Sequence, residues 1–193
     1  MGQNRSPAMS TLRIIGGDWR GRKITFSQLP GVRPTGDRVR ETLFNWLAPH
    51  LTGAKCLDLF AGSGALGLEA LSRGAAHCDF VDNQAENTRQ ISQQLAALDG
   101  NQKASVHCGD ALTWLAQHPA TWDIVFVDPP FDSALGEPSL RQLICNHRLH
   151  HNSWVYFESR RSEPEFIHDG SYNIFREKLT GDVCYRLLQP QLS

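Results

Sequence analysis

The chain contains 193 residues and 21.6 kDa, a length that suits one domain and is too short for two of ordinary size. Hydrophobic residues make up 40% and charged residues 20%, which supplies a core and excludes wholesale disorder. A net charge of -1 argues, taken alone, against a nucleic-acid partner. The first fifty residues, however, hold eight Lys or Arg against three Asp or Glu, a net +5, and the remaining 143 hold eleven against seventeen, a net -6. The sequence therefore predicts a basic N-terminal arm on an acidic body.

The sequence has the features of a protein from a reducing compartment. No apolar run approaches the ~18 residues that a membrane span needs, and the N-terminus lacks the charged and apolar regions of a secretory signal. The five cysteines lie 22 or more residues apart, which suits neither a disulfide framework nor a zinc site. We expect most of them to be buried thiols and the protein to be cytoplasmic.

The N-terminal region is expected to have three parts. Residues 1–11 are polar and unpatterned, which predicts a disordered tail. Residues 12–27 indicate two short strands around a glycine-rich turn, and a Pro/Gly loop over 30–36 follows. Asp37 is a candidate N-cap of a helix, because apolar residues recur after it at helical spacing. These apolar residues are Val39, Leu43, Trp46 and Leu47. We expect residues 12–50 to form the basic arm and residues 51–193 to form a second domain.

From residue 55 onward, strand-like and helix-like segments alternate. Apolar runs predict strands over 55–60, 78–81, 105–107, 124–127 and 154–158, and then a hairpin over 172–179 and 183–188. Helical stretches lie near 65–73, 84–98, 111–117 and 139–144. The alternation predicts an α/β fold: a mostly parallel seven-stranded sheet with helices on both faces and a C-terminal antiparallel hairpin.

Gly62, Gly64 and Gly67 form a G-x-G-x-x-G pattern between the first predicted strand of this domain and its helix. Glycine permits a tight turn and lets a ligand approach the backbone, where the N–H groups of the helix N-terminus are unpaired. The pattern favours a nucleotide-like cofactor over a tight strand–helix turn without a ligand.

Acidic residues lie inside the first strand of this domain and at the ends of the second and third. Asp82, 20 residues after Gly62, could accept hydrogen bonds from two ribose hydroxyls, and it could also cap the following helix. A dinucleotide-dependent dehydrogenase would fit these features equally well. Asp58 could meet a cationic ligand group and Asp110 an adenine amino group, which favours a different cofactor. A plain N-cap is the alternative interpretation of Asp110.

The fourth strand runs into Asp128-Pro129-Pro130-Phe131. Two consecutive prolines stiffen the backbone and remove two N–H donors, which leaves the Asp128 carboxylate and the Pro129 carbonyl as a rigid pair of acceptors. Such a pair could hold both hydrogens of an exocyclic amine and aim its lone pair at an electrophilic methyl group. Phe131 offers a face for stacking of a base. The alternative interpretation is a Pro-Pro loop with a buried phenylalanine.

Asp58, Gly62 and Gly64 together with this tetrapeptide resemble the class I S-adenosylmethionine-dependent amino-methyltransferases, whose usual tetrapeptide is [DN]-P-P-[FYW]. Stretches 13–23 and 33–45 of the arm are similar to the RsmD family, and the similarity covers roughly residues 12–189. The resemblance implies a Rossmann-like class I methyltransferase fold and methyl transfer from S-adenosylmethionine to the N2 amine of a guanine in 16S ribosomal RNA, guanine 966 in the family's usual numbering. It further implies action on an assembling small ribosomal subunit. We expect S-adenosylhomocysteine as the product, no metal, and a monomer.

The same resemblance implies a role for each candidate residue. Gly62 and Gly64 would pass under the methionine part of the cofactor, with Asp58 near its amino group. Asp82 would hold the ribose hydroxyls, and Asp110 with the Ala111 amide would hold the adenine. The implied cofactor-binding set is Asp58, Phe60, Ala61, Gly62, Gly64, Asp82, Asn83, Asp110 and Ala111. The implied catalytic set is Asp128, Pro129, Pro130 and Phe131. The implied RNA-binding set is Arg20, Arg22, Lys23, Arg33, Thr35 and Arg38.

Basic residues and histidines outside these motifs allow plainer interpretations. Arg20, Arg22 and Lys23 could be ordinary surface charge, but their clustering in an otherwise acidic chain favours contact with RNA phosphates. Arg38 and Arg40 lie about 200° apart on a helix, so both cannot face one partner, and we favour Arg38. The histidines within 146–151 have no Cys or carboxylate at ligand spacing, so we expect no metal there.

Other functions share parts of these patterns. An amino-methyltransferase that acts on another RNA, on DNA or on a protein glutamine would use the same tetrapeptide chemistry, but the arm motifs argue against it. An NAD-dependent oxidoreductase would share the glycine loop and leave the tetrapeptide unexplained. A non-catalytic RNA-binding module would need the arm and not the cofactor site.

Overall fold

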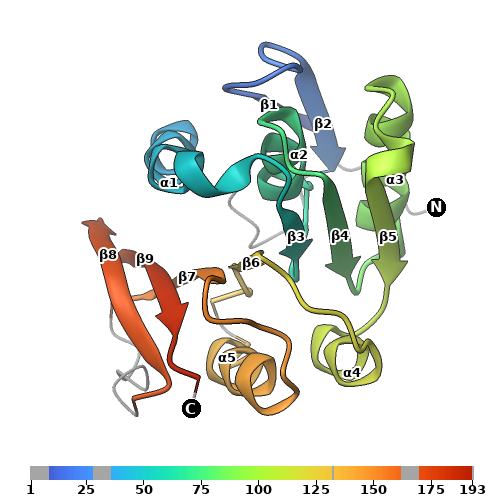
Figure 1. Cartoon of the computed structure of the whole chain (residues 1–193). Helices are drawn as coiled ribbons and strands as arrows, with labels where there is room; N and C mark the ends of the chain where they lie inside the picture. The colour runs from blue at the N-terminus through green and yellow to red at the C-terminus, as the bar shows by residue number, and fades with distance from the viewer. Residues whose placement is uncertain (1–8, 28–35, 132, 162–169, 193) are drawn as a thin grey trace, which may run out of the picture.

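The computed structural model describes residues 9–27, 36–131, 133–161 and 170–192. Two sheets are present in these residues: an antiparallel hairpin of β1 and β2, and a seven-stranded sheet in the order β5-β4-β3-β6-β7-β9-β8 (Figure 1). The strands are β1 (Met9–Arg13), β2 (Lys23–Ser27), β3 (Lys55–Asp58), β4 (His77–Asp82), β5 (Ala104–Cys108), β6 (Ile124–Val127), β7 (Trp154–Arg160), β8 (Tyr172–Thr180) and β9 (Val183–Pro190). The helices are α1 (Asp37–Leu51), α2 (Ala65–Ser72), α3 (Ala85–Ala97), α4 (Ala111–Gln117) and α5 (Gly136–Cys145), with a 3-10 turn at Asn101–Lys103.

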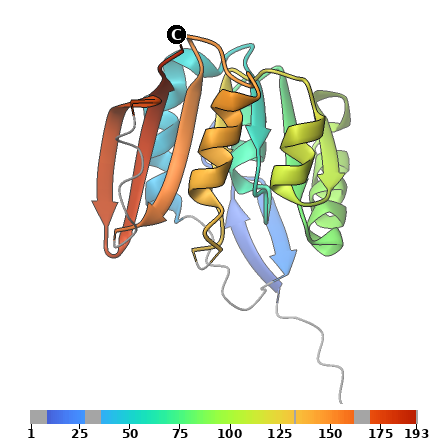
Figure 2. The same ribbon diagram turned by 90° about the horizontal axis from the view of Figure 1, so that it is seen from below.

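Helices cover both faces of the large sheet, so its central strands read as continuous apolar runs. The hairpin, α1, α2 and α3 lie on one face, and α4 and α5 lie on the other (Figures 1 and 2). All four residues of β6 are buried: Phe126 packs toward the α1 side, and Val127 packs toward the α5 side. Strands β5, β4, β3, β6 and β7 are parallel. The predicted seven-stranded α/β architecture is confirmed.

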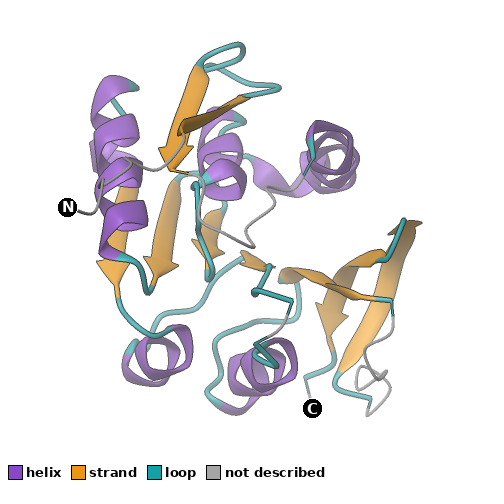
Figure 3. Ribbon diagram, turned by 180° about the vertical axis from the view of Figure 1, so that it is seen from behind, coloured by secondary structure: helices purple, strands orange, loops and turns teal. Residues whose placement is uncertain are grey.

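The C-terminal hairpin is also confirmed. Strands β8 and β9 pair antiparallel, and β9 pairs antiparallel with β7, so the parallel sheet ends in an antiparallel edge (Figure 3). Gly181 occupies the connecting turn with φ +59°, a conformation that glycine adopts without strain. Strand β8 is exposed along nearly its whole length.

Two local expectations for the N-terminal region are wrong. Strand β1 begins at Met9, so residues 9–11 pair in the hairpin and do not belong to a disordered tail. Asp37 is the first residue of α1 and not its cap; Gly36 is the N-cap, without a side-chain hydrogen bond. The Asp37 carboxylate instead accepts a hydrogen bond from Arg40, one turn further along the helix, at 2.6 Å.

The hairpin and α1 share one hydrophobic core with the sheet. Ile14 and Ile24 of the hairpin and Leu43 and Phe44 of α1 are buried in the same cluster as Phe126 of β6. The Phe44 and Phe126 rings lie 5.9 Å apart, centroid to centroid. The basic arm is therefore held against the sheet by apolar packing.

Cys56, Cys78 and Cys184 are buried and Cys108 and Cys145 are exposed, and none of the five forms a disulfide. The prediction that most of the thiols are buried is confirmed. Burial is the main cause that raises the pKa of the Cys78 thiol well above its usual value, so this thiol is protonated. None of the helices in the described part of the chain is long and apolar enough to cross a membrane.

Candidate cofactor and substrate site

The glycine pattern lies at the turn between β3 and α2. Gly62 and Gly64 have φ +52° and +75°, and Gly64 is the N-cap of α2, so both occupy the left-handed region that favours glycine. Gly67 has a different role: a Cβ there would collide with the Phe80 ring and with the Cys78 sulfur on β4. The three glycines thus shape a tight turn and let α2 pack closely on the sheet.

Asp58 ends β3 with its side chain buried beneath this turn. Its carboxylate accepts a hydrogen bond from the Gly67 N–H at 3.0 Å. Burial raises the pKa of Asp58 to about 7, the Gly67 hydrogen bond acts in the opposite direction, and the negative charge of Asp82 raises the pKa further. No Lys, Arg or His among the described residues forms an ion pair with Asp58. A cation placed beside this carboxylate would offset the cost of its burial.

Asp82 ends β4 and ties the glycine turn to α3. One carboxylate oxygen accepts a hydrogen bond from the Gly62 N–H at 2.7 Å. The other accepts from the Gln84 N–H at 2.8 Å and from the Asn87 amide at 3.0 Å. The N-cap of α3 is Gln84, so Asp82 contacts the start of the helix from two residues earlier and is not its cap.

Asp110 follows β5 and is the N-cap of α4. Its Oδ1 accepts hydrogen bonds from the backbone N–H and the hydroxyl of Thr113, at 2.8 and 2.7 Å. These hydrogen bonds hold the pKa of Asp110 below its usual value. The plain-cap interpretation of Asp110 therefore describes its contacts in this structure, and Ala111, the first residue of α4, is buried behind it.

The Asp-Pro-Pro-Phe turn follows β6, the neighbour of β3. Asp128 is half-buried, Pro129 is buried and Pro130 is exposed. The Pro130 carbonyl accepts hydrogen bonds from the Ser133 N–H at 3.0 Å and the Ser133 hydroxyl at 2.6 Å, which closes the turn. Phe131 is half-buried, and the Arg160 guanidinium lies 5.7 Å from its ring centroid.

The sheet order brings all four acids to one edge of the sheet. Strands β5, β4, β3 and β6 are adjacent and parallel, so their carboxyl ends, which carry Asp110, Asp82, Asp58 and Asp128, line a common edge. The chain order reverses between β3 and β6, and open α/β sheets bind ligands at such a reversal. The glycine turn and the tetrapeptide turn lie on the two sides of this point.

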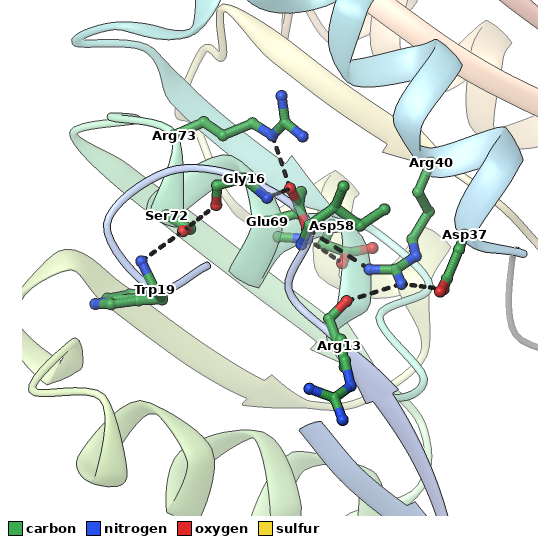
Figure 4. A network of polar contacts seen from close by, with 11 residues as sticks. Arg13, Gly16, Trp19, Asp37, Arg40, Asp58, Glu69, Ser72 and Arg73 are labelled. Carbon is green, nitrogen blue, oxygen red and sulfur yellow. Dashed lines mark hydrogen bonds and ion pairs between the residues drawn. The ribbon is translucent and has the colours of Figure 1, made fainter. Parts of the chain in front are cut away.

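Two buried charged residues join the arm to α2 (Figure 4): Arg40, and Glu69, which the sequence motifs did not single out. The Glu69 carboxylate accepts hydrogen bonds from the Ile15 and Gly16 N–H groups, both at 2.8 Å, and from Arg73 at 2.7 Å. Arg40, which is fully buried, lies 3.6 Å from Glu69 and donates to the Arg13 carbonyl at 3.0 Å. The one available signal for Glu69 was a charged residue in an otherwise uncharged, mostly apolar helix.

The candidate RNA-binding residues lie on the surface where they are described. Arg20, Arg22, Lys23 and Arg38 are exposed, and Arg22 also donates a hydrogen bond to the Ala97 carbonyl at 2.8 Å. Arg33 and Thr35 lie outside the described residues. Figure 2 shows the hairpin strands extending past the edge of the sheet where the parallel strands end. The turn of the hairpin lies toward the opposite edge, because Trp19 and Arg22 contact Ser72 and Ala97, the last residues of α2 and α3.

The histidines of 146–151 make local contacts. His150 Nε2 lies 2.8 Å from an Asp123 oxygen, and His147 has φ +54° at the end of α5. Across the described ranges, no group of three or more His, Cys, Asp or Glu residues is arranged to hold a metal ion.

Comparison with known proteins places the chain in a family. The family model described as Conserved hypothetical protein 95 matches residues 12–189. Ribosomal RNA small subunit methyltransferase D of Escherichia coli K12 is 47% identical over 178 residues, 92% of this chain and 89% of that protein. The protein of the same name from Haemophilus influenzae is 42% identical over 185 residues, 94% of this chain and 95% of that protein.

The chain belongs to the RsmD family. Solved structures agree: a methyltransferase from Escherichia coli superimposes with a TM-score of 0.85 at 45% identity, covering 95% of this chain and all of that one. A methylase from Haemophilus influenzae superimposes with a TM-score of 0.81 at 39% identity, with the same coverage. The predicted family membership and the Rossmann-like class I methyltransferase fold are confirmed.

Proposed function

We propose that this protein transfers a methyl group from S-adenosylmethionine to the exocyclic N2 amine of a guanine in 16S ribosomal RNA. The observation that carries the proposal is the pairing of the β3 glycine turn with the Asp128-Pro129 acceptors at the end of the adjacent strand β6. Membership of the RsmD family, whose relatives are named for small-subunit ribosomal RNA, supports the class of substrate.

The residues at the sheet edge fit this cofactor. Asp58 is a buried carboxyl group whose pKa is raised by burial, and the cationic amino group of the cofactor would stabilise its ionised form. Gly62 and Gly64 leave the backbone open to a ligand, with Phe60, Ala61 and Asn83 in the flanking turns. The Asp82 carboxylate would exchange part of its present hydrogen bonding for ribose hydroxyls. Asp110 and Ala111 would flank the adenine. Asp110 would use Oδ2, because Oδ1 accepts the hydrogen bond from the Thr113 N–H. When bound, S-adenosylmethionine supplies an electrophilic methyl group.

The tetrapeptide would hold and orient the target amine. The nitrogen of an amine on an aromatic base is a weak nucleophile, because its lone pair is delocalised into the ring. Hydrogen bonds from its two hydrogens to the Asp128 carboxylate and the Pro129 carbonyl favour a pyramidal nitrogen with a directed lone pair. Phe131 would stack on the base, which must leave its own stack to reach this turn. Asp128 is also positioned to accept the proton that the methylated amine releases.

The arm, residues 12–50, would hold the RNA backbone. Exposed Arg20, Arg22, Lys23 and Arg38 would neutralise phosphates, together with Arg33 and Thr35. The hairpin strands extend past the carboxyl edge of the sheet, so RNA held by the far turn, where Arg22 contacts the end of α3, would run along the hairpin toward the tetrapeptide. The natural substrate would be the RNA within an assembling small ribosomal subunit, and the enzyme would act as a cytoplasmic monomer.

Two measurements test the proposal. Calorimetric titration of the protein should give binding of S-adenosylmethionine and none of NAD; the reverse result would favour an oxidoreductase. Mass spectrometry of 16S ribosomal RNA from a strain that lacks the gene should find one lost N2-methylguanosine, which returns when the gene is restored. An unchanged set of methylated nucleotides would reject the proposed substrate.

A further inference from the structure

Strand β7 places a second carboxylate beside the tetrapeptide. Glu158 is only 8% exposed although it lies near the carboxyl end of the strand. Strands β6 and β7 are parallel, with Val127 opposite Phe157, so the next residues in each strand, Asp128 and Glu158, are neighbours at the sheet edge. Trp154 and Tyr156, which alternate with Glu158 along the strand, belong to the core on the α1 side, as Phe126 does two residues before Asp128. Both carboxylates therefore leave the sheet on the same side.

Contacts around Glu158 agree with this placement. The Tyr156 hydroxyl donates a hydrogen bond to Glu158 Oε2 at 2.7 Å. After burial, the negative charges of Glu158 and then Asp128 are the largest causes that raise the pKa of Tyr156, so both carboxylates lie near this one hydroxyl. Arg160, the next residue on the same side of β7, reaches the Phe131 ring. The end of β7 thus borders the proposed place of the target base.

One oxygen of Glu158 is available to a substrate. Oε2 is occupied by the Tyr156 hydroxyl, whereas Oε1 has no hydrogen-bond partner among the residues that the structure describes. Burial raises the pKa of Glu158, and the Tyr156 hydrogen bond opposes that rise by stabilising the ionised form. A buried carboxylate with one unpaired oxygen is stabilised by an N–H donor, and its negative charge makes that hydrogen bond stronger than one between neutral groups.

The chemistry of the bases identifies that donor. Adenine, cytosine and guanine all have an exocyclic amine, so the Asp128-Pro129 acceptors alone do not distinguish them. The ring nitrogen beside the amine does: it carries a hydrogen in guanine (N1–H) and a lone pair in adenine and cytosine. A carboxylate next to the amine site would accept the hydrogen of guanine and repel the lone pair of the other two bases.

We propose that Glu158 is a specificity-determining residue that accepts the N1–H of the target guanine while Asp128 and Pro129 hold its N2 amine. This inference rests on the proposed function. Tyr156 is then a positioning residue, since its hydroxyl occupies Oε2 and turns Oε1 toward the base.

The test uses small-subunit particles that carry either guanine or 2-aminopurine at the target position, which mass spectrometry of the wild-type product identifies first. 2-Aminopurine keeps the N2 amine and has a lone pair at N1. The wild-type protein should methylate guanine with a kcat/KM at least about 100-fold higher. In Glu158→Gln, the amide oxygen accepts from Tyr156 and the NH2 group faces the base. The kcat/KM for guanine should then fall about 10- to 100-fold and that for 2-aminopurine should stay nearly the same, so the ratio of the two kcat/KM values falls about 10- to 100-fold.

The controls separate the possible failures. Glu177→Gln makes the same chemical change on β8, where Glu177 pairs with Arg186 at 2.6 Å, and it should leave the preference unchanged. The affinity of Glu158→Gln for S-adenosylmethionine should also be unchanged, which would show that the fold is intact. Wild-type protein that does not methylate the guanine particle would overturn the proposed function. Active wild-type protein with the same guanine preference in Glu158→Gln would overturn only the role of Glu158.

Discussion

The buried Glu69 carboxylate links the arm to the body through two backbone N–H groups and Arg40, and Glu69→Gln tests this link. The substitution keeps the volume and removes the charge. One carboxylate oxygen becomes an NH2 group, which cannot accept from the N–H donors that now reach that position. Arg40, which is fully buried, keeps the exposed Asp37 as its one ionic partner among the described residues. Removal of one partner from a buried ion pair costs about 3–5 kcal/mol. For a chain of this length, that loss corresponds to a fall of roughly 10 °C in Tm.

Glu137→Gln is the matched control. Like Glu69 and Arg73, Glu137 and Arg141 are four residues apart on one helix and form an ion pair, with 2.8 Å between a guanidinium nitrogen and a carboxylate oxygen. The Glu137 and Arg141 side chains, however, are 42% and 56% exposed. Solvent screening limits the loss there to about 0.5 kcal/mol. Thermal unfolding followed by circular dichroism measures both variants, and hydrogen exchange should be faster at the Ile15 and Gly16 amides in Glu69→Gln alone. Equal Tm shifts in the two variants would refute the conclusion that the buried charge anchors the hairpin.

The other predictions concern catalysis, RNA binding and pH. Asp128→Ala should abolish methyl transfer and leave the calorimetric affinity for S-adenosylmethionine intact; normal turnover would reject the pair of acceptors. Arg20→Ala with Arg22→Ala should weaken RNA binding without a change in cofactor affinity. The slope of log Kd against log salt concentration should fall by an amount that corresponds to up to about two phosphate contacts. An unaltered slope would show that these two residues do not contact RNA phosphates. The pKa of Asp58 is raised to about 7 in the folded protein. Between about pH 4 and 7, Asp58 is therefore protonated in the folded state and ionised in the unfolded state. Stability of the ligand-free protein should therefore fall as pH rises through that window, by up to about 1.4 kcal/mol per pH unit relative to Asp58→Asn. Parallel curves of unfolding free energy against pH for the wild-type protein and Asp58→Asn would contradict the raised pKa.

Local patterns in the sequence predict most of the fold. Alternating apolar runs and helical periodicity depend on neighbouring residues, so the central strands and helices were predicted to within a few residues of their bounds. The chief differences lie at ends: β3 stops at Asp58, where the glycine turn begins, and α5 starts at Gly136, before its apolar positions. The glycine turn and the tetrapeptide were recognisable because each is a contiguous segment with unusual backbone requirements.

The sequence by itself determined the fold class, the family and the order of acids that follow the strands, because these depend on local pattern and contiguous motifs. Only the tertiary structure decided which charged residues are buried. Arg38 and Arg40 are two residues apart in one helix, yet Arg38 is exposed and Arg40 is buried against Glu69, 29 residues away. Glu158 likewise reads as one acid in an apolar strand until the parallel register places it beside Asp128. Such partners meet through long-range packing, and no local pattern in the chain specifies which of them will meet.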